Sequence, residues 1–470
     1  QTPEGEQLGR MRYDDNGQPY TQHNPGWDMT FSAPKGVSVM AEVGGDERLI
    51  RAHDEAVNAA LQKVEERTTT RIKEDGEIHR QQTGNFAAAS FRHEMSRNCD
   101  ANLHTHSVIG NMTKDENGQY RSIDGQEFFR LQREQTEAYH AELGARLNAC
   151  GYTAERVQQP NGKITVDIKE APKELVEDHS SRSDDINESL RKFGIDPETA
   201  TAKQRETAAL NSREAKAPVD HTEMRQAWQD HAQGKGYDLD AIIQQAKGSE
   251  HSRENAGQDA REVVDKARGM LGEREAQFGK DELRQLATRE AISSSATPQD
   301  VEQAISDAEQ RGELIAEGER YTTPEAVQTE QEMIRAESAG RDSVSPLVGA
   351  GHAEEAIKKT EAETGYSFNQ SQREATEGIL RGTDRVVGIQ GYAGTAKTSS
   401  VIRTVAREAE QKGEVVGIAP THSAKDSLAE GAGLDRADTV AAYLAKEQNA
   451  ETQEEIEREP RTVIVDEASL

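Results

Sequence analysis

Changes in the spacing of apolar residues along the chain predict where its helices and strands lie. Apolar residues recur at helical spacing from 47 to 66 and again from 127 to 150, where Gly151 ends the pattern. Residues 27–31 alternate like a strand, and 85–112 predict two strands joined by a polar turn. Together these elements predict an α+β domain whose strands are mainly antiparallel.

The rest of the chain follows two other patterns. Residues 169–235 are charged, poor in large apolar side chains and predicted to be helical. Short helices followed by two strands around a turn predict a winged-helix-like unit within 257–325. After Phe368, unbroken apolar strands alternate with helices, which is typical of a parallel α/β sheet. These strands are predicted at 385–390, 414–420 and 462–465.

The same patterns divide the chain into three domains joined by two linkers. We predict an α+β domain at residues 1–235, a winged-helix-like connecting region at 257–330 and a partial α/β lobe at 365–470. Polar, turn-rich sequence predicts the linkers at 236–256 and 331–364.

Composition narrows the class of protein. The 470 residues carry 57 Lys and Arg against 86 Asp and Glu, and the formal charge is −29. This acidity, taken alone, argues against a nucleic-acid partner, although a local basic strip can exist within it. No run of 18 apolar residues exists, which excludes a transmembrane helix. Two cysteines, Cys99 and Cys150, allow no disulfide framework, and we expect a reducing cytoplasm.

Three histidines are candidates for a metal site. His104 and His106 are two positions apart on a predicted strand, so both rings point to one face of the sheet. His93 lies on the preceding strand and can sit beside them in a hairpin. Three neutral imidazoles leave open positions on a divalent ion, which suits catalysis, and Asp28 is the candidate to orient a ring. The competing interpretation is that these are ordinary surface histidines on a strand.

A glycine-rich turn between a predicted strand and a predicted helix has the context of a phosphate-binding loop. It contains Gly391, Gly394, Ala396, Lys397 and Thr398. In a Walker A motif the backbone N–H groups cradle phosphate, the lysine meets the β/γ oxygens and the threonine ligates Mg²⁺. Ala396 stands where the consensus has glycine, and its Cβ can narrow the loop.

A second acidic motif supports the phosphate-loop interpretation. Asp466 and Glu467 follow an apolar strand about 70 residues downstream of the loop, as in a Walker B motif. We expect Asp466 to hold Mg²⁺ and Glu467 to polarise the attacking water.

Three sequence blocks resemble the conjugative relaxases of the MobF class, the TrwC/TraI-type relaxase–helicases. They are Trp27 to Lys35, Phe91 to Glu94 and Leu103 to His106, in the family's order and at compatible spacing. The resemblance covers roughly residues 8–230 and implies an HUH-type endonuclease fold. It implies that His93, His104 and His106 hold Mg²⁺, Mn²⁺ or Zn²⁺, that Asp28 helps to activate a nucleophile and that Lys35 contacts DNA.

The family's nucleophile is a tyrosine upstream of the block that contains Asp28. Tyr13 and Tyr20 precede Asp28 but do not lie in the tyrosine-bearing motif, so neither is assigned. Both ends of the sequence resemble cut ends of a longer polypeptide, and we expect the tyrosine in a segment before Gln1. This chain is then expected to bind metal and DNA but not to nick.

Residues 365–470 resemble the first RecA-like lobe of a superfamily 1, RecD-like helicase. The resemblance implies that Gln372 contacts adenine and that Thr421 and Thr439 contact single-stranded DNA. It ends at the Walker B motif, so the second lobe is not covered, and we expect weak ATP binding and no translocation by this chain.

The first hypothesis is therefore a cytoplasmic bacterial relaxase–helicase that nicks plasmid transfer-origin DNA by tyrosine transesterification and unwinds it with ATP. The resemblance implies relaxosome accessory proteins and a type IV coupling protein as partners, without membrane insertion. The alternatives are a non-catalytic DNA-binding module with degenerate metal and nucleotide sites, and a plain P-loop NTPase with an unrelated zinc-stabilised N-terminal domain.

Overall fold

The structure is a computed structural model that describes most of the chain. It covers residues 10–13, 18–22, 24–74, 76–159, 162–212, 220–250, 253–349, 351–392, 394–451 and 461–466. The chain forms two compact units, Gln1–Val327 and Gln328–Leu470. Within the described ranges, no helix is both long and apolar enough to cross a membrane.

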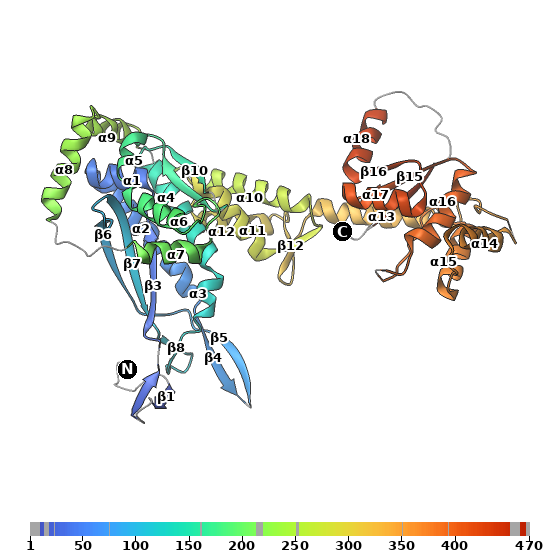
Figure 1. Cartoon of the computed structure of the whole chain (residues 1–470), viewed down its shortest axis with the longest axis horizontal. Coiled ribbons are helices and arrows are strands. Elements are labelled where there is room, and N and C mark those ends of the chain that lie inside the picture. The colour runs from blue at the N-terminus through green and yellow to red at the C-terminus, as the bar shows by residue number, and fades with distance from the viewer. Residues whose placement is uncertain are drawn as a thin grey trace. The chain divides into compact units, whose positions relative to one another are not determined.

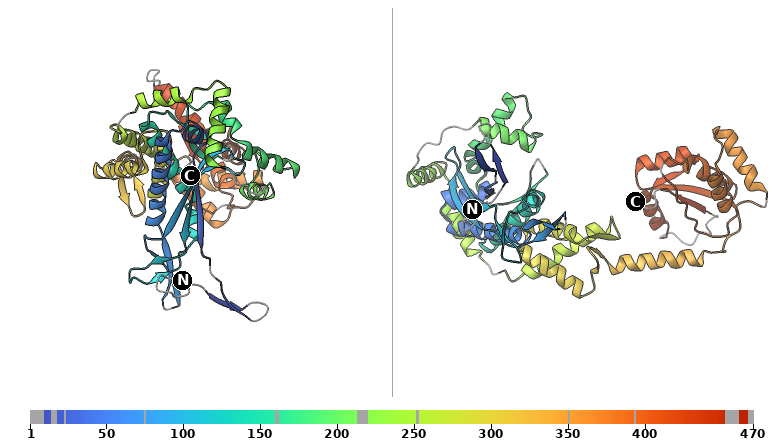
Figure 2. Two further views of the ribbon diagram at one scale, coloured as in Figure 1. Left: turned by 90° about the vertical axis from the view of Figure 1, so that its left-hand side faces the viewer. Right: turned by 90° about the horizontal axis from the view of Figure 1, so that it is seen from below.

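A three-stranded antiparallel sheet forms the centre of the first unit (Figures 1 and 2). Its order is β3 (Gly26–Ser32), β7 (Ala101–Gly110) and β6 (Ala88–Met95). Side chains along β7 are alternately buried and partly exposed, because one face packs on the core while the other meets solvent. The predicted strands at 27–31 and within 85–112 are confirmed.

Two long helices supply much of the core on the covered side of this sheet. Helix α2 (Glu47–Glu66) buries the apolar stripe that the sequence predicts and contacts β7 and α4 (Gln132–Ala149). The predicted helix at 127–150 is in fact two helices, α3 (Gln126–Arg130) and α4, with the break at Leu131. The Trp27 ring meets Phe128 edge-on at 5.1 Å, a contact that holds α3 against β3.

Smaller elements complete the part of the first unit that surrounds the sheet. They are β1 (Arg10–Tyr13), β2 (Pro19–Gln22), α1 (Lys35–Ser38), η1 (Val39–Val43), β4 (Thr69–Glu74), β5 (Glu77–Gln82), β8 (Thr113–Lys114), β9 (Tyr120–Arg121), β10 (Ala154–Gln158), β11 (Ile164–Ile168), α5 (Lys173–Asp178), α6 (Ser181–Lys192), α7 (Ala202–Asn211) and α8 (His221–Gly234).

The linker predicted at 236–256 is wrong. Helix α9 (Leu239–Gly248) occupies its middle, and Leu239, Ile243 and Ala246 are buried in the main core. These residues are spaced at i, i+4 and i+7, so they form one apolar stripe even though most of the segment is polar.

The predicted connecting region packs on the same core as the central sheet. It contains α10 (Ala256–Gly272), β12 (Gln277–Gly279), α11 (Lys280–Glu290), η2 (Ala291–Ser293), α12 (Pro298–Gln310), β13 (Ile315–Glu317) and β14 (Arg320–Thr322), with antiparallel sheet order β12-β14-β13. Gly144 of α4 faces this region so closely that a Cβ there would lie 2.1 Å from the carbonyl oxygen of Ile292. Ion pairs such as Lys63–Glu302 add to the contact.

The second unit contains a parallel sheet, as predicted, but only two of its three strands were predicted. Its order is β16 (Ala437–Thr439), β15 (Glu414–Ala419) and β17 (Arg461–Val465). The other elements of this unit are α14 (His352–Thr364), α15 (Gln370–Arg381), η3 (Thr398–Ile402), α16 (Arg403–Glu410), α17 (His422–Ala432) and α18 (Val440–Glu451). Helix α13 (Pro324–Ala339) begins in the first unit and ends in the second.

Two sequence predictions in the second unit are wrong. The linker at 331–364 includes most of α13 and all of α14, whose Ala353 and Ala356 pack with Leu380 and Val405. The strand at 385–390 is not formed, and Val386 and Val387 are about half exposed. A strand needs a hydrogen-bonded neighbour, and the segment has none within the part of the chain that the structure describes.

Candidate metal and phosphate sites

Three imidazole rings converge on the solvent-facing side of the central sheet. His93 of β6 lies directly opposite His104 of β7, and His106 is two positions further along β7. The ring centroids are 5.3 Å apart for His93 and His104, 5.4 Å for His93 and His106, and 5.3 Å for His104 and His106. The prediction that the rings share one face is therefore confirmed.

Oxygen atoms fix the orientation of two of these rings. Nδ1 of His106 lies 2.8 Å from Oδ2 of Asp28 and 3.1 Å from Oγ1 of Thr30, both on β3. Nδ1 of His104 lies 2.8 Å from the carbonyl oxygen of Asn102 and 3.0 Å from the side-chain amide nitrogen of the same residue. Where Nδ1 donates to its oxygen partner, Nε2 is the nitrogen left to bind a metal, as in metal-binding histidines.

Burial favours the neutral form of the His104 ring, which is the form that binds a cation. Desolvation lowers the pKa of His104 despite the hydrogen bond to Asn102, which favours the neutral ring that a metal requires. No group of three or more histidine, cysteine or carboxylate side chains in the described ranges already has metal-holding geometry. The chemistry of the donor set, three imidazoles on one face, fits a divalent ion.

A second histidine network supports the site from behind the sheet. His53 of α2 is fully buried, with Nε2 2.9 Å from Oγ1 of Thr105 and Nδ1 2.8 Å from the hydroxyl of Tyr139. Thr105 lies between the two histidines of β7 and points to the opposite face. Burial lowers the pKa of His53 to about 4, so the ring is neutral at pH 7. The sequence analysis missed this residue, whose only signal is its position on the apolar stripe of α2.

Lys35, the residue predicted to contact DNA in the first unit, has a backbone partner in the structure. Its amine donates a hydrogen bond to the carbonyl oxygen of Ala101 at 3.0 Å, and burial lowers its pKa although Asp100 opposes this. The hydrogen bond ties the side chain to the start of β7, and a DNA contact by Lys35 stays a prediction.

In the glycine-rich loop of the second unit, the lysine side chain binds to the backbone of the loop itself. Nζ of Lys397 donates to the carbonyl oxygens of Gly391 at 2.6 Å and Tyr392 at 3.1 Å, and Thr398 starts η3. Gly394 has φ +76°, and Ala396 has φ +53°, a left-handed conformation that a side chain disfavours. Ala396 thus keeps the backbone shape that glycine would adopt freely.

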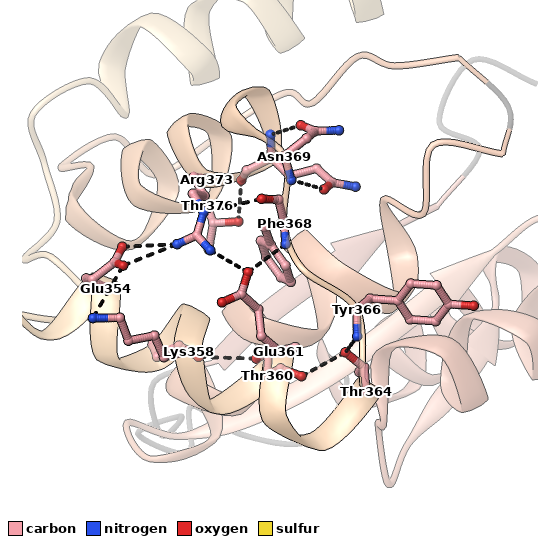
Figure 3. A network of polar contacts seen from close by, with 12 residues as sticks. Glu354, Lys358, Thr360, Glu361, Thr364, Tyr366, Phe368, Asn369, Arg373 and Thr376 are labelled. Atoms are coloured by element: carbon pink, nitrogen blue, oxygen red, sulfur yellow. Dashed lines mark hydrogen bonds and ion pairs between the residues drawn. The ribbon is translucent and has the colours of Figure 1, made fainter.

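Gln372 connects helix α15 to this loop. Its Nε2 donates to the carbonyl oxygen of Thr395 at 3.0 Å, while its Oε1 and backbone N–H exchange hydrogen bonds with Asn369 in a capping box. Behind the cap, Arg373 pairs with Glu354 and Glu361 and donates to the Phe368 carbonyl (Figure 3). The start of α15 is therefore held rigidly next to the phosphate loop.

The remaining predicted residues lie at the ends of the second unit's elements. Oγ1 of Thr421 accepts a hydrogen bond from the Ala424 N–H at 3.1 Å and caps α17, and Thr439 lies at the end of β16. Asp466 follows β17, and its N–H donates to the Ile418 carbonyl. Glu467 lies outside the described residues. Thr421, Thr439 and Asp466 all follow strands of one parallel sheet, so they share its carboxyl-terminal edge.

Two family models match the chain. Residues 1–234 match the TrwC relaxase model, and residues 367–470 match an AAA domain. The multifunctional conjugation protein TraI of Escherichia coli is 35% identical over 292 residues, which are 59% of this chain and 16% of that protein. TraI of strain K12 is 33% identical over the same shares. The chain thus spans about one sixth of the length of these relatives.

Solved structures of conjugative relaxase TrwC are also similar. A metal-free complex with OriT DNA is 35% identical, with a TM-score of 0.45, and covers 50% of this chain and 81% of that one. A metal-bound complex has the same identity, TM-score and share of this chain, and 79% of that structure is covered. Residues 1–234 therefore form a relaxase domain of the TrwC family, of the MobF type.

Proposed function

We propose that this chain is part of a conjugative relaxase–helicase that nicks one strand of plasmid transfer-origin DNA and unwinds the duplex with ATP. The observation that carries the proposal is the convergence of His93, His104 and His106 on one face, with Asp28 on Nδ1 of His106. The relaxase family match and the AAA-domain match support the two halves of the proposal.

The three histidines are the proposed ligands of Mg²⁺, Mn²⁺ or Zn²⁺. When bound, such an ion polarises a phosphoryl oxygen of the scissile phosphodiester. The protein's own residues orient the site: Asp28 and Thr30 fix the ring of His106, and the Asn102 carbonyl fixes that of His104. A tyrosine phenolate of the whole protein would attack the phosphorus, form a phosphotyrosine link and release the 3′-hydroxyl.

The second unit is the proposed start of the motor. Lys397 and Thr398 would meet the phosphates and Mg²⁺ of ATP, with Gly391, Gly394 and Ala396 shaping the loop. Binding requires Lys397 to leave the two loop carbonyls that it contacts. Asp466 would assist Mg²⁺, Glu467 would polarise water, Gln372 would contact adenine, and Thr421 and Thr439 would contact single-stranded DNA.

We further propose that residues 257–330 form a winged-helix unit whose role is structural. The order of its helices and strands, and the sheet order β12-β14-β13, support this assignment. Helix α12 carries Asp300, Glu302, Asp307 and Glu309, so it would repel DNA phosphates. Ile292 packs against α4, and Glu302 pairs with Lys63. These contacts favour a structural support within the first unit over a DNA-binding surface.

The proposal also covers the partners of the protein and its location in the cell. The DNA partners are origin and single-stranded DNA, the protein partners are relaxosome accessory proteins and a type IV coupling protein, and the location is the bacterial cytoplasm. One observation favours an alternative for the motor half: the left-handed Ala396 in the phosphate loop suits a degenerate nucleotide site.

Metal-dependent DNA binding tests the proposed function. Fluorescence anisotropy would measure the affinity of the chain for a labelled origin hairpin with a single-stranded extension, with Mn²⁺ and with EDTA. We expect tighter binding with Mn²⁺ and no such gain in a His104→Ala, His106→Ala variant. Equal affinity under both conditions in the unmodified chain would favour a non-catalytic DNA-binding module.

A further inference from the structure

An exposed aromatic side chain borders the three histidines. Phe91 lies on β6 directly opposite His106 of β7 and two residues before His93, so its ring is on the histidine face of the sheet. Its side chain is 55% exposed. The other residues of β6 before Glu94 are Ala88, Ala89, Ser90, Arg92 and His93, all small or polar.

A second apolar residue is exposed on the histidine face of the sheet. Val108 of β7 is 44% exposed and lies on the same face, because it is two positions beyond His106 and directly opposite Asp28. On the other face of β7, Leu103, Thr105, Ser107 and Ile109 are buried, as expected where the strand meets the core. The open face of an antiparallel sheet is normally polar, so Phe91 and Val108 depart from the pattern at the position of the candidate metal site.

From this placement we infer that Phe91 stacks on the nucleobase next to the scissile phosphate of single-stranded DNA, with Val108 against the adjoining deoxyribose. The inference rests on the proposed function, because it needs a phosphate at the three histidines. A base and the phosphate beside it are separated by one sugar, and Phe91 and His106 are directly paired residues of neighbouring strands, so both contacts can be made by one nucleotide. Stacking on an aromatic ring is available to every base and needs no sequence-specific hydrogen bond.

The residues exposed around Phe91 favour DNA over a protein surface as the partner of this ring. Around Phe91 the exposed groups are imidazoles, Thr30 and Asp28, a set that suits a metal-bridged phosphate and a flat base. The apolar area consists of two side chains, too small for a stable protein interface, which needs hundreds of Å² on each partner.

Anisotropy with labelled oligo(dT) in Mn²⁺ tests the inference. Phe91→Ala is expected to weaken binding about 10-fold, Phe91→Leu to weaken it nearly as much, and Phe91→Trp to preserve it within about 2-fold. Phe193→Ala removes another exposed phenylalanine, at the end of α6, and is expected to leave affinity unchanged. On an abasic oligomer of the same length, the unmodified chain and Phe91→Ala should bind equally.

The outcomes separate the inference from the proposed function. If the unmodified chain fails to bind oligo(dT), the inference is overturned, while the proposed function is decided by the origin-hairpin experiment. If it binds, and Phe91→Ala binds as tightly, the inference alone is overturned. If Phe91→Ala lowers the melting temperature by several degrees while DNA affinity is unchanged, Phe91 is covered by protein and not by a base. The same loss on abasic as on normal oligo(dT) would also overturn the stacking role.

Discussion

Oδ2 of Asp28 lies 2.8 Å from Nδ1 of His106, across the pairing of β3 with the central strand β7. The contact holds the ring of His106 in one orientation and favours a proton on Nδ1, which leaves Nε2 as the nitrogen that could bind a metal. The carboxylate therefore acts on the candidate ion through the ring and does not have to touch the ion.

Replacing Asp28 with Asn should weaken the metal site without unfolding the domain. An amide at this position can present its N–H to Nδ1, which favours the wrong tautomer, so we expect Mn²⁺ affinity to fall about 10- to 100-fold in isothermal titration calorimetry. Asp54→Asn is the matched control, because Asp54 pairs with Arg92 on the covered side of the same sheet. An affinity equal to that of the unmodified chain would show that Asp28 does not position a ligand.

Stability should fall as the pH drops from about 6.5 to 4. His53 and His140 are buried, and burial lowers the pKa of each to about 4. In the unfolded chain these rings bind protons below pH 6.5, so within this window the unfolded state holds more protons and is favoured as pH falls. The full effect is at most about 3 kcal/mol per ring, from the size of each pKa shift.

Thermal unfolding across this pH range measures the effect. A His53→Gln variant keeps a polar side chain that does not titrate, so its melting temperature should vary less with pH than that of the unmodified chain. An identical pH profile for the two proteins would mean that His53 is already protonated in the folded state or does not gain a proton on unfolding.

Ala396→Gly should strengthen nucleotide binding. Glycine adopts the positive φ of this position freely, whereas alanine costs about 1 kcal/mol, so the loop should reach its phosphate-binding shape more readily. We expect Mg²⁺–ATP affinity to rise several-fold in calorimetry. Gly394→Ala places a Cβ at another positive φ and should have the opposite effect. Weaker binding by Ala396→Gly would show that the methyl group contributes a contact.

Gly144→Ala should separate the connecting region from α4. The new Cβ would lie 2.1 Å from the Ile292 carbonyl oxygen, a backbone atom that cannot move alone, and we expect a loss of about 1–3 kcal/mol in the free energy of unfolding. Gly269→Ala in α10 is the control, since its Cβ meets nothing within 4 Å and alanine favours a helix. Chemical denaturation distinguishes the two, and equal stability of both variants would contradict the close packing.

The sequence predicted the shared face of the three histidines because that geometry is local. A period of two fixed the common face of His104 and His106, and a hairpin fixed the partner strand of His93. The Asn102 carbonyl and His53 were missed, because backbone orientation and packing behind a sheet leave no spacing signal. The segment 385–390 has the composition of a strand, yet strand formation depends on a neighbour that composition does not reveal.

Direct observation of the metal ligands tests the central claim most closely. X-ray absorption at the zinc edge, on the chain loaded with one equivalent of Zn²⁺, should show about three imidazole nitrogens at about 2.0–2.1 Å. A variant with alanine at His93, His104 and His106 should lose this signal. Zinc bound without imidazole scattering, or an unchanged spectrum in the variant, would contradict a metal site built from these three rings.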